Sequence, residues 1–348
     1  MWKKLLLVIM LMGLLSLPAL AAAQSERIVV WHALTEDDTA VLVQAADAFQ
    51  EQTGVTVEFR YVQPTLLYET VASAAQSRGT GPDVIIADNS IMAPLIDKDL
   101  ITPSQDGGTF FLADLLKNLP ALVDERCTDI GIMSCLWPRV SPALPVPALD
   151  DTVVSLTPDW LCESSGWLPF CRDGGLSGVA ISWGFNVYLM NTAWTAQQGI
   201  EPPTSAEAIQ QMRSDYGLNI VEAKSGDIPT ASAADSPPVY LIPSTLIAED
   251  PNGVMRSMGS FYEAGYSALI EMHIDAAYLA AASANAAQAG DFIAFLQSDA
   301  DAQAALLDSS QRLPAFDADT LSGQVDTPAG LATIQALVTL ATYAALAY

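Results

Sequence analysis

Short apolar runs alternate with longer amphipathic segments between residues 28 and 88. Residues 28–31 form a continuous apolar run, which is the pattern of a strand covered on both faces. Thr35 predicts the start of a helix, with Asp38 three residues later as the second half of a capping pair, and Gly54 predicts its end. Apolar residues recur within this helix at helical spacing: Val41, Ala45, Ala48 and Phe49.

A second strand, a second helix and a third strand follow. Residues 55–62 alternate between apolar and polar positions, which predicts a strand with one buried face. Pro64 predicts the start of the second helix and Gly79 its end, and residues 82–88 form a third short apolar strand. Connections of this length give parallel strands joined by right-handed crossovers, with helices on both sides of the sheet. The predicted fold class is therefore α/β.

Ligands of such sheets bind beyond the carboxyl ends of the strands. His32 follows the first strand, Gln63 the second and Asp88 the third, so we expect these residues, with the adjacent Trp31 and Asn89, along one rim. Three of these residues have a structural role as the alternative to solute binding. Trp31 can pack against the first helix, His32 can bond to the backbone, and Asp88 can cap the helix that follows it.

The region from 104 to 178 is rich in Pro, Cys and Trp and predicts irregular structure. All four cysteines of the chain lie in it, which predicts two disulfides if the protein is exported. Of the three possible pairings we expect local closure, Cys127–Cys135 and Cys162–Cys171. A zinc site is the weaker alternative, because the spacings are long and no histidine is near.

The remaining sequence predicts a long strand around Gly184, where a glycine indicates a bend or a close approach. A helix follows that Thr204 or Ser205 caps, and then a loop over residues 222–238. The stretch 266–282 is ambiguous between strand and helix. Residues 285–307 are helical with a break near 298–299, and the last eighteen residues predict a buried helix.

The chain begins with a pattern typical of a secretory signal peptide. Lys3 and Lys4 precede an apolar run, Pro18 interrupts it, and alanines offer cleavage sites near residue 23. We expect export to the periplasm or the extracellular space. A lipid anchor is not expected, because no cysteine stands at the cleavage point. An uncleaved membrane anchor is the alternative.

Composition narrows the partners. Apolar residues make up 51% of the 348 residues, which predicts a packed globular protein of two domains or one large one. Without the leader, 12 basic residues stand against 40 acidic ones, a net charge of −28. A surface so acidic argues against nucleic acid and against anionic lipid as partners.

Four stretches, in order, resemble the extracellular solute-binding proteins of ABC importers, in the carbohydrate-binding group that includes maltose-binding protein. They are "IVVWHALTEDDTAVLVQAADAFQEQTGVTVEFRYV", "GTGPDVIIADNSIMAPLIDKDLITP", "ISWGFNVYLMNTAWTAQQGIEPPTSAEAI" and "AAQAGDFIAFLQSDADAQAALLDSSQRLPAFDAD". Together they cover somewhat over a third of the mature chain.

The resemblance implies a two-lobed fold like that of periplasmic binding proteins, with a hinge and a cleft between the lobes. With the signal peptide at 1–23, it implies a first lobe at 24–182, a second lobe at 183–265, and a C-terminal segment at 266–348 that returns to the lobes. The sequence departs from the family pattern in two places: the 104–178 insertion is longer than usual, and the segment from about 208 to 265 is shorter, so we expect a reduced second lobe. It also implies a monomer that captures a sugar and delivers it to a membrane permease. Trp183, as an aromatic platform, and Asn186 then face the solute from the crossing between lobes.

Enzyme signatures are absent from the sequence: it has no G-x-S-x-G, H-E-x-x-H, P-loop or G-x-G-x-x-G motif. We expect no catalytic residue, metal or cofactor. A secreted glycoside hydrolase stays an alternative, because 40 acidic residues offer many carboxylate pairs. Binding of a polyamine or a metal ion on the same fold is another; a polyamine suits the acidic charge, with Trp183 and Asp88 as partners.

Overall fold

The computed structural model describes residues 27–77, 80–88, 91–102, 178–231, 239–310, 312–315, 318–324 and 326–347. The predicted leader, the four cysteines, Asn89 and Gly79 lie outside these ranges, and so does nearly all of the predicted insertion. The strands are β1 (Arg27–His32), β2 (Thr56–Tyr61), β3 (Val84–Asp88), β4 (Val179–Asn191), β5 (Ile220–Glu222), β6 (Val239–Pro243), β7 (Tyr266–Leu279) and β8 (Leu313–Pro314).

Helices surround these strands. They are the 3-10 helix η1 (Pro64–Leu66) and the α-helices α2 (Glu36–Thr53), α3 (Leu67–Ala75), α4 (Ala93–Asp97), α9 (Thr192–Gln198), α10 (Ala206–Tyr216), α11 (Thr245–Glu249), α12 (Pro251–Glu263), α13 (Ala286–Ser298), α14 (Ala300–Ser310), α15 (Ala318–Gln324) and α16 (Pro328–Ala347). None of the described helices combines the length and hydropathy that a membrane span requires.

One mixed sheet connects the described strands, in the order β2-β1-β3-β7-β4-β6-β5, with β8 paired to β4. β1 is parallel to both β2 and β3, which confirms the predicted parallel unit and the α/β class. β7 enters the sheet antiparallel to β3 on one side and to β4 on the other.

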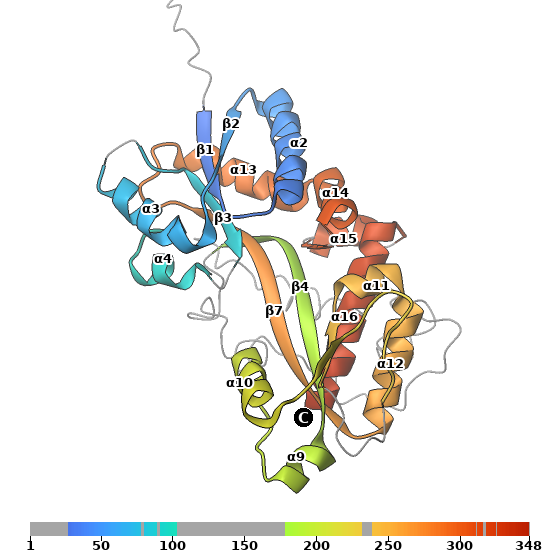
Figure 1. The fold of residues 1–348 in the computed structure, drawn as a ribbon. Coiled ribbons are helices and arrows are strands. Elements are labelled where there is room, and N and C mark those ends of the chain that lie inside the picture. Colours follow the sequence, from blue (N-terminus) through green and yellow to red (C-terminus); the bar gives the residue numbers. More distant parts are fainter. Residues whose placement is uncertain are drawn as a thin grey trace, which may run out of the picture.

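The structure has two lobes, and β4 and β7 run side by side from one into the other (Figure 1). β1, β2 and β3 lie in the upper lobe with α2, α3, α4 and α13, whereas α9, α10, α11, α12 and α16 lie in the lower lobe. The boundary predicted between residues 182 and 183 falls inside β4, and residue 266, where the predicted return segment begins, is the first residue of β7.

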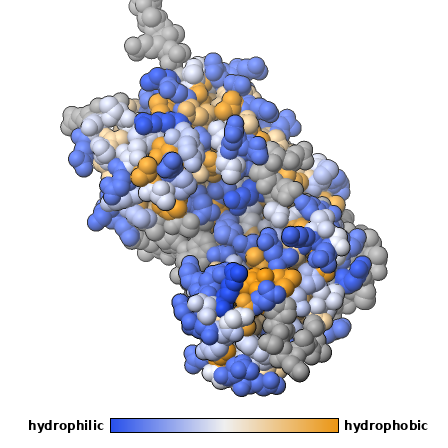
Figure 2. All heavy atoms as spheres, viewed as in Figure 1, coloured by the Kyte–Doolittle hydropathy of each residue, from blue (hydrophilic) through white to orange (hydrophobic). Residues whose placement is uncertain are grey.

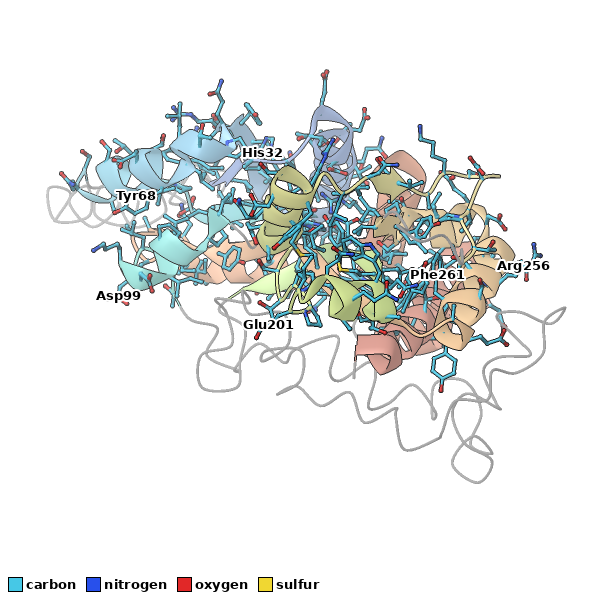
Figure 3. The ribbon with its side chains drawn as sticks, turned by 60° about the horizontal axis from the view of Figure 1, so that its bottom comes forward. His32, Tyr68, Asp99, Glu201, Arg256 and Phe261 are labelled. Carbon is cyan, nitrogen blue, oxygen red and sulfur yellow. The ribbon has the colours of Figure 1, made fainter. Side chains whose placement is uncertain are left out.

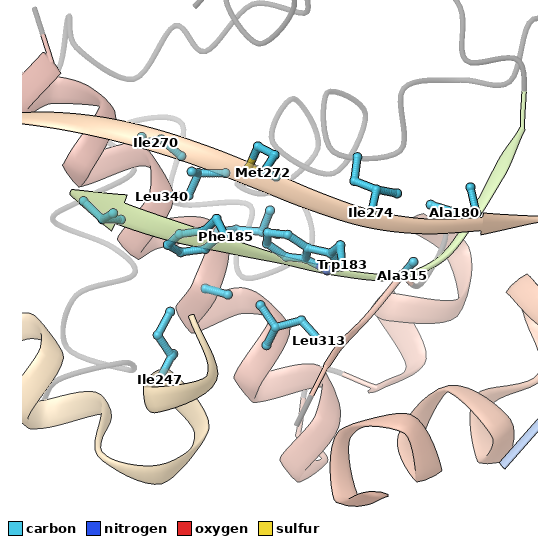
Figure 4. Close-up of a cluster of buried hydrophobic side chains, with 14 of the residues drawn as sticks. Ala180, Trp183, Phe185, Ile247, Ile270, Met272, Ile274, Leu313, Ala315 and Leu340 are labelled. Atoms are coloured by element: carbon cyan, nitrogen blue, oxygen red, sulfur yellow. The ribbon is translucent and has the colours of Figure 1, made fainter. Parts of the chain in front are cut away.

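Buried apolar side chains form three clusters, which are the cores of the structure. The largest follows one face of β4 and β7 and continues under α12 and α16; Figure 4 shows Trp183 and Phe185 inside it. A second packs α2 and α13 against the upper strands, around Phe49 and Phe292. A third packs α9 and α10 against the lower end of β4, around Trp194. Polar residues dominate the visible surface, with scattered apolar spots (Figure 2).

Local signals placed the helix ends well. Thr35 caps α2 by accepting a hydrogen bond from the backbone N–H of Asp38, and Gly54 ends that helix in the left-handed conformation, with φ of 77°. The predicted break at 298–299 is real, because α14 starts anew where Asp299 accepts from the N–H of Ala302 at 2.8 Å. Of the two predicted caps of α10, Ser205 is the one that accepts from the helix.

The structure decides the nature of the stretch at 266–282 and the role of Gly184. The ambiguous stretch at 266–282 is mainly the strand β7, because its neighbours on both sides satisfy its backbone groups. The register irregularity in β4 lies between Ala180 and Ser182 and not at Gly184. Gly184 instead marks a close approach, since a Cβ there would lie 3.0 Å from Ser244 Oγ.

Candidate functional site

The carboxyl ends of β1, β2 and β3 meet at one edge, as predicted. His32 is opposite Tyr61 on one side and Ile86 on the other. Gln63 follows β2 and is exposed, and Asp88 is the last residue of β3 and is half-buried. Asn89 lies outside the described residues.

The two tryptophans predicted as solute contacts are core residues in the structure. Trp183 is fully buried, and its indole Nε1–H donates to the carbonyl of Pro314 at 2.8 Å. Trp31 is 3% exposed, lies in the same large cluster, and has the guanidinium carbon of Arg60 4.7 Å above its ring. The prediction of an exposed flat face on Trp183 is wrong, because alternation along β4 turns this residue toward α16.

His32 is held by packing. The residue is 3% exposed, and its ring meets the rings of Phe59 and Tyr61 edge-on, with centroids 6.0 and 5.7 Å away. Its Nδ1 lies 3.4 Å from Thr39 Oγ1, on the first part of α2. Burial lowers the pKa of His32, so the imidazole is neutral at pH 7. Figure 3 marks His32 in the upper lobe, and Phe261 of α12 inside the lower one.

The middle of β4 and β7 carries a second set of polar side chains, which we call the polar face. Residues opposite each other in an antiparallel pair share a face, and the pairs here are Ser182–Asp275, Gly184–His273 and Asn186–Glu271. Apolar packing covers both ends of this face: Ala277 belongs to the upper cluster under α2 and α13, and Leu269 packs on the lower cluster under α10. The polar face therefore lies between the packed parts of the two lobes.

Four side chains form the lower group of the polar face. Asn186 Nδ2 lies 2.9 Å from His273 Nε2 and donates to Glu271 Oε2 at 3.3 Å. The hydroxyl of Tyr188 donates to the same Glu271 oxygen at 3.3 Å, and His273 Nε2 lies 3.6 Å from it. The His273 and Glu271 side chains are 31% and 20% exposed, so this group is both internally bonded and accessible.

The lower group also sets the protonation of its members. The neighbouring His273 imidazole lowers the pKa of Glu271, and the hydrogen bonds from Asn186 and Tyr188 lower it further, although burial acts in the opposite direction. Burial and the charge of Glu271 together raise the pKa of Tyr188 to about 12. Glu271 is thus a stable carboxylate acceptor and Tyr188 a neutral hydroxyl at pH 7.

Asp275 is the centre of the upper group of the polar face. Ser182 donates to its Oδ2 at 2.8 Å, and Arg312 Nε lies 3.8 Å from the same oxygen. Asp88 is its direct partner across β3 and β7. Burial raises the pKa of Asp275; Arg312 and Ser182 lower it, whereas the negative charges of Asp88 and Asp38 raise it.

Of the residues predicted as solute contacts, Asn186 lies on this face and Asp88 beside it. Sequence reasoning did not single out the other polar residues of the two groups: Tyr188, Glu271, His273, Asp275 and the adjacent Arg312. The alternating stretch "EMHID" was the available signal, because it sets three polar residues on one side of a strand. Tyr61 was missed as well: it shares the face of His32 and is 56% exposed, so it offers an aromatic surface at the rim.

The part of the chain that the structure describes contains no arranged set of metal ligands. No three His, Cys, Asp or Glu side chains of these residues are grouped so as to hold an ion. The chemistry of the polar face is instead that of hydrogen bonding, with carboxylate, amide, imidazole and hydroxyl groups side by side.

No protein-family model and no curated protein sequence matches the chain. Several solved structures are similar to it. A cyclo/maltodextrin-binding protein complexed with maltotetraose has a TM-score of 0.45 and 12% identity, and the match covers 91% of this chain and 86% of that one.

Two further similar structures come from named organisms. The maltose/maltodextrin-binding domain of Bdellovibrio bacteriovorus, bound to maltotriose, has a TM-score of 0.43 and 11% identity over 92% and 87% of the two chains. The maltotriose-binding protein of Thermus thermophilus has a TM-score of 0.41 and 10% identity over 89% and 87%. The chain is thus similar, at low identity and over about nine-tenths of its length, to sugar-binding proteins.

Proposed function

We propose that this protein is the solute-binding component of an ABC importer. In this proposal it captures a carbohydrate on the polar face between its lobes and delivers it to a membrane permease, acting as a monomer without catalysis. The observation that carries the proposal is the row of polar side chains at the centre of two strands whose ends are both covered by apolar packing.

The chemistry of this face suits a sugar. Sugar hydroxyls both donate and accept, so planar side chains with two polar atoms bind them well. Asn186, Glu271 and His273 are of this kind, and His273 and Glu271 are accessible. Sugars also present apolar C–H surfaces that pack on aromatic rings, and the exposed ring of Tyr61 at the rim provides one.

Features of the sequence support export and transport. The leader-like start, the four stretches that resemble solute-binding proteins and the strongly acidic composition all agree with a protein that works outside the cytoplasm. In this proposal the solute contacts both lobes at once, since β4 and β7 run from one lobe into the other. Gln63 and Asp88, at the rim of the upper lobe, are proposed as additional contacts.

A thermal denaturation screen of the protein without its leader tests this function. The panel contains neutral and amine-bearing trisaccharides, spermidine and divalent metal ions. A saccharide present at 100 times its Kd stabilises the fold by roughly 2.7 kcal/mol. We expect at least one saccharide to raise the Tm and to remain intact after prolonged incubation.

The control is the double variant Glu271→Ala, His273→Ala, which removes two accessible polar groups and leaves the buried clusters unchanged. We expect this variant to fold and to lose the saccharide-dependent rise in Tm. If no saccharide stabilises the wild-type protein, or if cleavage products accumulate, carbohydrate capture without catalysis is wrong.

A further inference from the structure

The lower group of the polar face uses its hydrogen-bond donors internally. Asn186 Nδ2 carries two hydrogens and has two acceptors within reach, Glu271 Oε2 at 3.3 Å and His273 Nε2 at 2.9 Å. The hydroxyl of Tyr188 donates to the same Glu271 oxygen, 3.3 Å away. The amide hydrogens of Asn186 and the hydroxyl hydrogen of Tyr188 are therefore all taken by neighbours within the group.

The carboxylate of Glu271 fixes which end of the Asn186 amide bonds to the group. The neighbours of Glu271 hold its pKa below the ordinary value, so its side chain is an anion at pH 7. An anionic carboxylate only accepts hydrogen bonds, so the NH₂ end of the amide has to face it. The amide oxygen Oδ1 is then the end of Asn186 that bonds to neither Glu271 nor His273.

Two acceptor oxygens of this group have no hydrogen-bond partner in the described chain. Glu271 makes its bonds with Asn186 and Tyr188 through Oε2 alone, so Oε1 accepts none, and Asn186 Oδ1 accepts none either. Neither oxygen is among the buried polar atoms of the described residues that lack a partner, so both reach the accessible surface. Glu271 and Asn186 are directly opposite each other across β4 and β7, so their open oxygens belong to neighbouring side chains of one face.

An arrangement with open acceptors and occupied donors discriminates between solutes. A solute that covers Glu271 Oε1 and Asn186 Oδ1 removes the water that bonds to them. A covered acceptor that finds no donor weakens binding, and the loss is larger when the acceptor is charged. A solute bound here therefore has to bring O–H or N–H groups of its own.

We propose that the lower group selects sugars by the donors they carry, and that Glu271 Oε1 and Asn186 Oδ1 bind two free hydroxyl groups on neighbouring ring carbons. This inference rests on the proposed function and specifies the class of sugar. Neighbouring hydroxyls supply two O–H donors side by side, which matches acceptors on two directly opposed residues. A sugar substituted at either hydroxyl lacks the hydrogen, and a sugar with a carboxylate at this place meets the like charge of Glu271.

Calorimetric titration with fluorinated sugars tests the subsite. The probes are maltotriose, cellotriose and mannotriose and, for one that binds, the analogues in which a single hydroxyl is replaced by fluorine. Fluorine is close to a hydroxyl in size but has no hydrogen to donate. We expect fluorine at one position to weaken binding at least tenfold, because a bond to the charged Glu271 is lost. Fluorine on the adjacent carbon should weaken it by about threefold, since the Asn186 oxygen is neutral.

Three variants assign these two penalties to residues. Glu271→Gln keeps the size of the side chain and places an NH₂ group where Oε1 stood, so the larger penalty should shrink to within about twofold. Asn186→Ala is the second subsite variant, to be used if Glu271→Gln does not fold, and should abolish the smaller penalty. Glu222→Gln removes an exposed carboxylate of β5 whose charge acts on Tyr188, and should leave both penalties unchanged.

The outcomes separate the two proposals. Equal affinity for every fluorinated analogue overturns the acceptor subsite and leaves carbohydrate capture in place, and so does binding of amine-bearing trisaccharides alone. Penalties that survive in folded Glu271→Gln and Asn186→Ala overturn the assignment to these two residues. Absence of binding by any saccharide overturns both proposals.

Discussion

Trp183 and Asn186 stand three positions apart on β4 and face opposite sides of it. Trp183 is fully buried with Phe185, Met272 and Ile274 under α16, and its one polar atom is bonded to Pro314. Asn186 is half-buried and shares hydrogen bonds with Glu271 and His273, whose side chains remain accessible. The same pair of strands therefore presents an apolar face to the core and, on its other side, a polar face that lies between the packed parts of the lobes.

In the proposed function, the two faces give one pair of strands two roles, packing on one side and solute binding on the other. Alternation with a period of two assigns neighbouring residues to opposite sides, so packing and recognition do not compete for the same positions. Substitutions on the apolar face should change stability first, and substitutions on the polar face should change binding first. The predictions below test this separation.

Trp183→Ala should have the largest effect on stability. It removes a fully buried ring and leaves the Pro314 carbonyl without its donor, and large-to-small changes of this kind cost about 3–5 kcal/mol. Urea denaturation followed by circular dichroism measures the loss. An unchanged midpoint would contradict the assignment of Trp183 to the core.

Asp275 and Glu271 should make contributions to the free energy of unfolding that change with pH in opposite directions. The pKa of Asp275 is raised above its ordinary 3.8, so the folded state holds the proton more tightly and stability falls as pH rises above that value. The pKa of Glu271 is lowered below its ordinary 4.5. Its contribution is therefore fully present above that value and is lost as pH falls through the folded-state pKa.

The variants Asp275→Asn and Glu271→Gln test these opposite pH dependences, through urea denaturation of each variant and of the wild type over a range of pH. Relative to wild type, the free energy of unfolding of Asp275→Asn should rise with increasing pH. That of Glu271→Gln should fall as pH rises through the acidic range and then level off. Both effects should be smaller than that of Trp183→Ala. If the free energies of unfolding of the two variants, relative to wild type, changed with pH in the same direction, the opposite pKa shifts of Asp275 and Glu271 would be contradicted.

Local sequence signals predicted much of the upper lobe. The Thr35 cap, the Gly54 stop and the parallel order of β1, β2 and β3 each depend on a few neighbouring residues, and all three are confirmed. The rim at His32 and Asp88 followed from the same order of strands.

The faces of the long strands could not be predicted in the same way. Most of β4 is apolar on both sides, so its sequence does not say which side meets the core, and a shift of one residue exchanges the faces. Trp183 was predicted from the crossing between lobes that the resemblance implies, and the pairing of β4 with β7 places it in the core instead. Asp275, Arg312 and Asp38 come from distant parts of the chain, and only the pairing of β7 with β3 and β4 brings Asp275 to the carboxyl edge of the upper strands.

The central claim is that the polar face, and not the apolar one, binds the solute. Calorimetric titration of the tightest-binding saccharide into Asn186→Ala and Trp183→Phe tests it most directly, because both side chains come from β4 and Phe keeps most of the buried bulk. We predict that Asn186→Ala weakens binding at least tenfold, about 1.4 kcal/mol, while a folded Trp183→Phe binds within about twofold of wild type. Weakened binding by Trp183→Phe together with unchanged binding by Asn186→Ala would contradict the account.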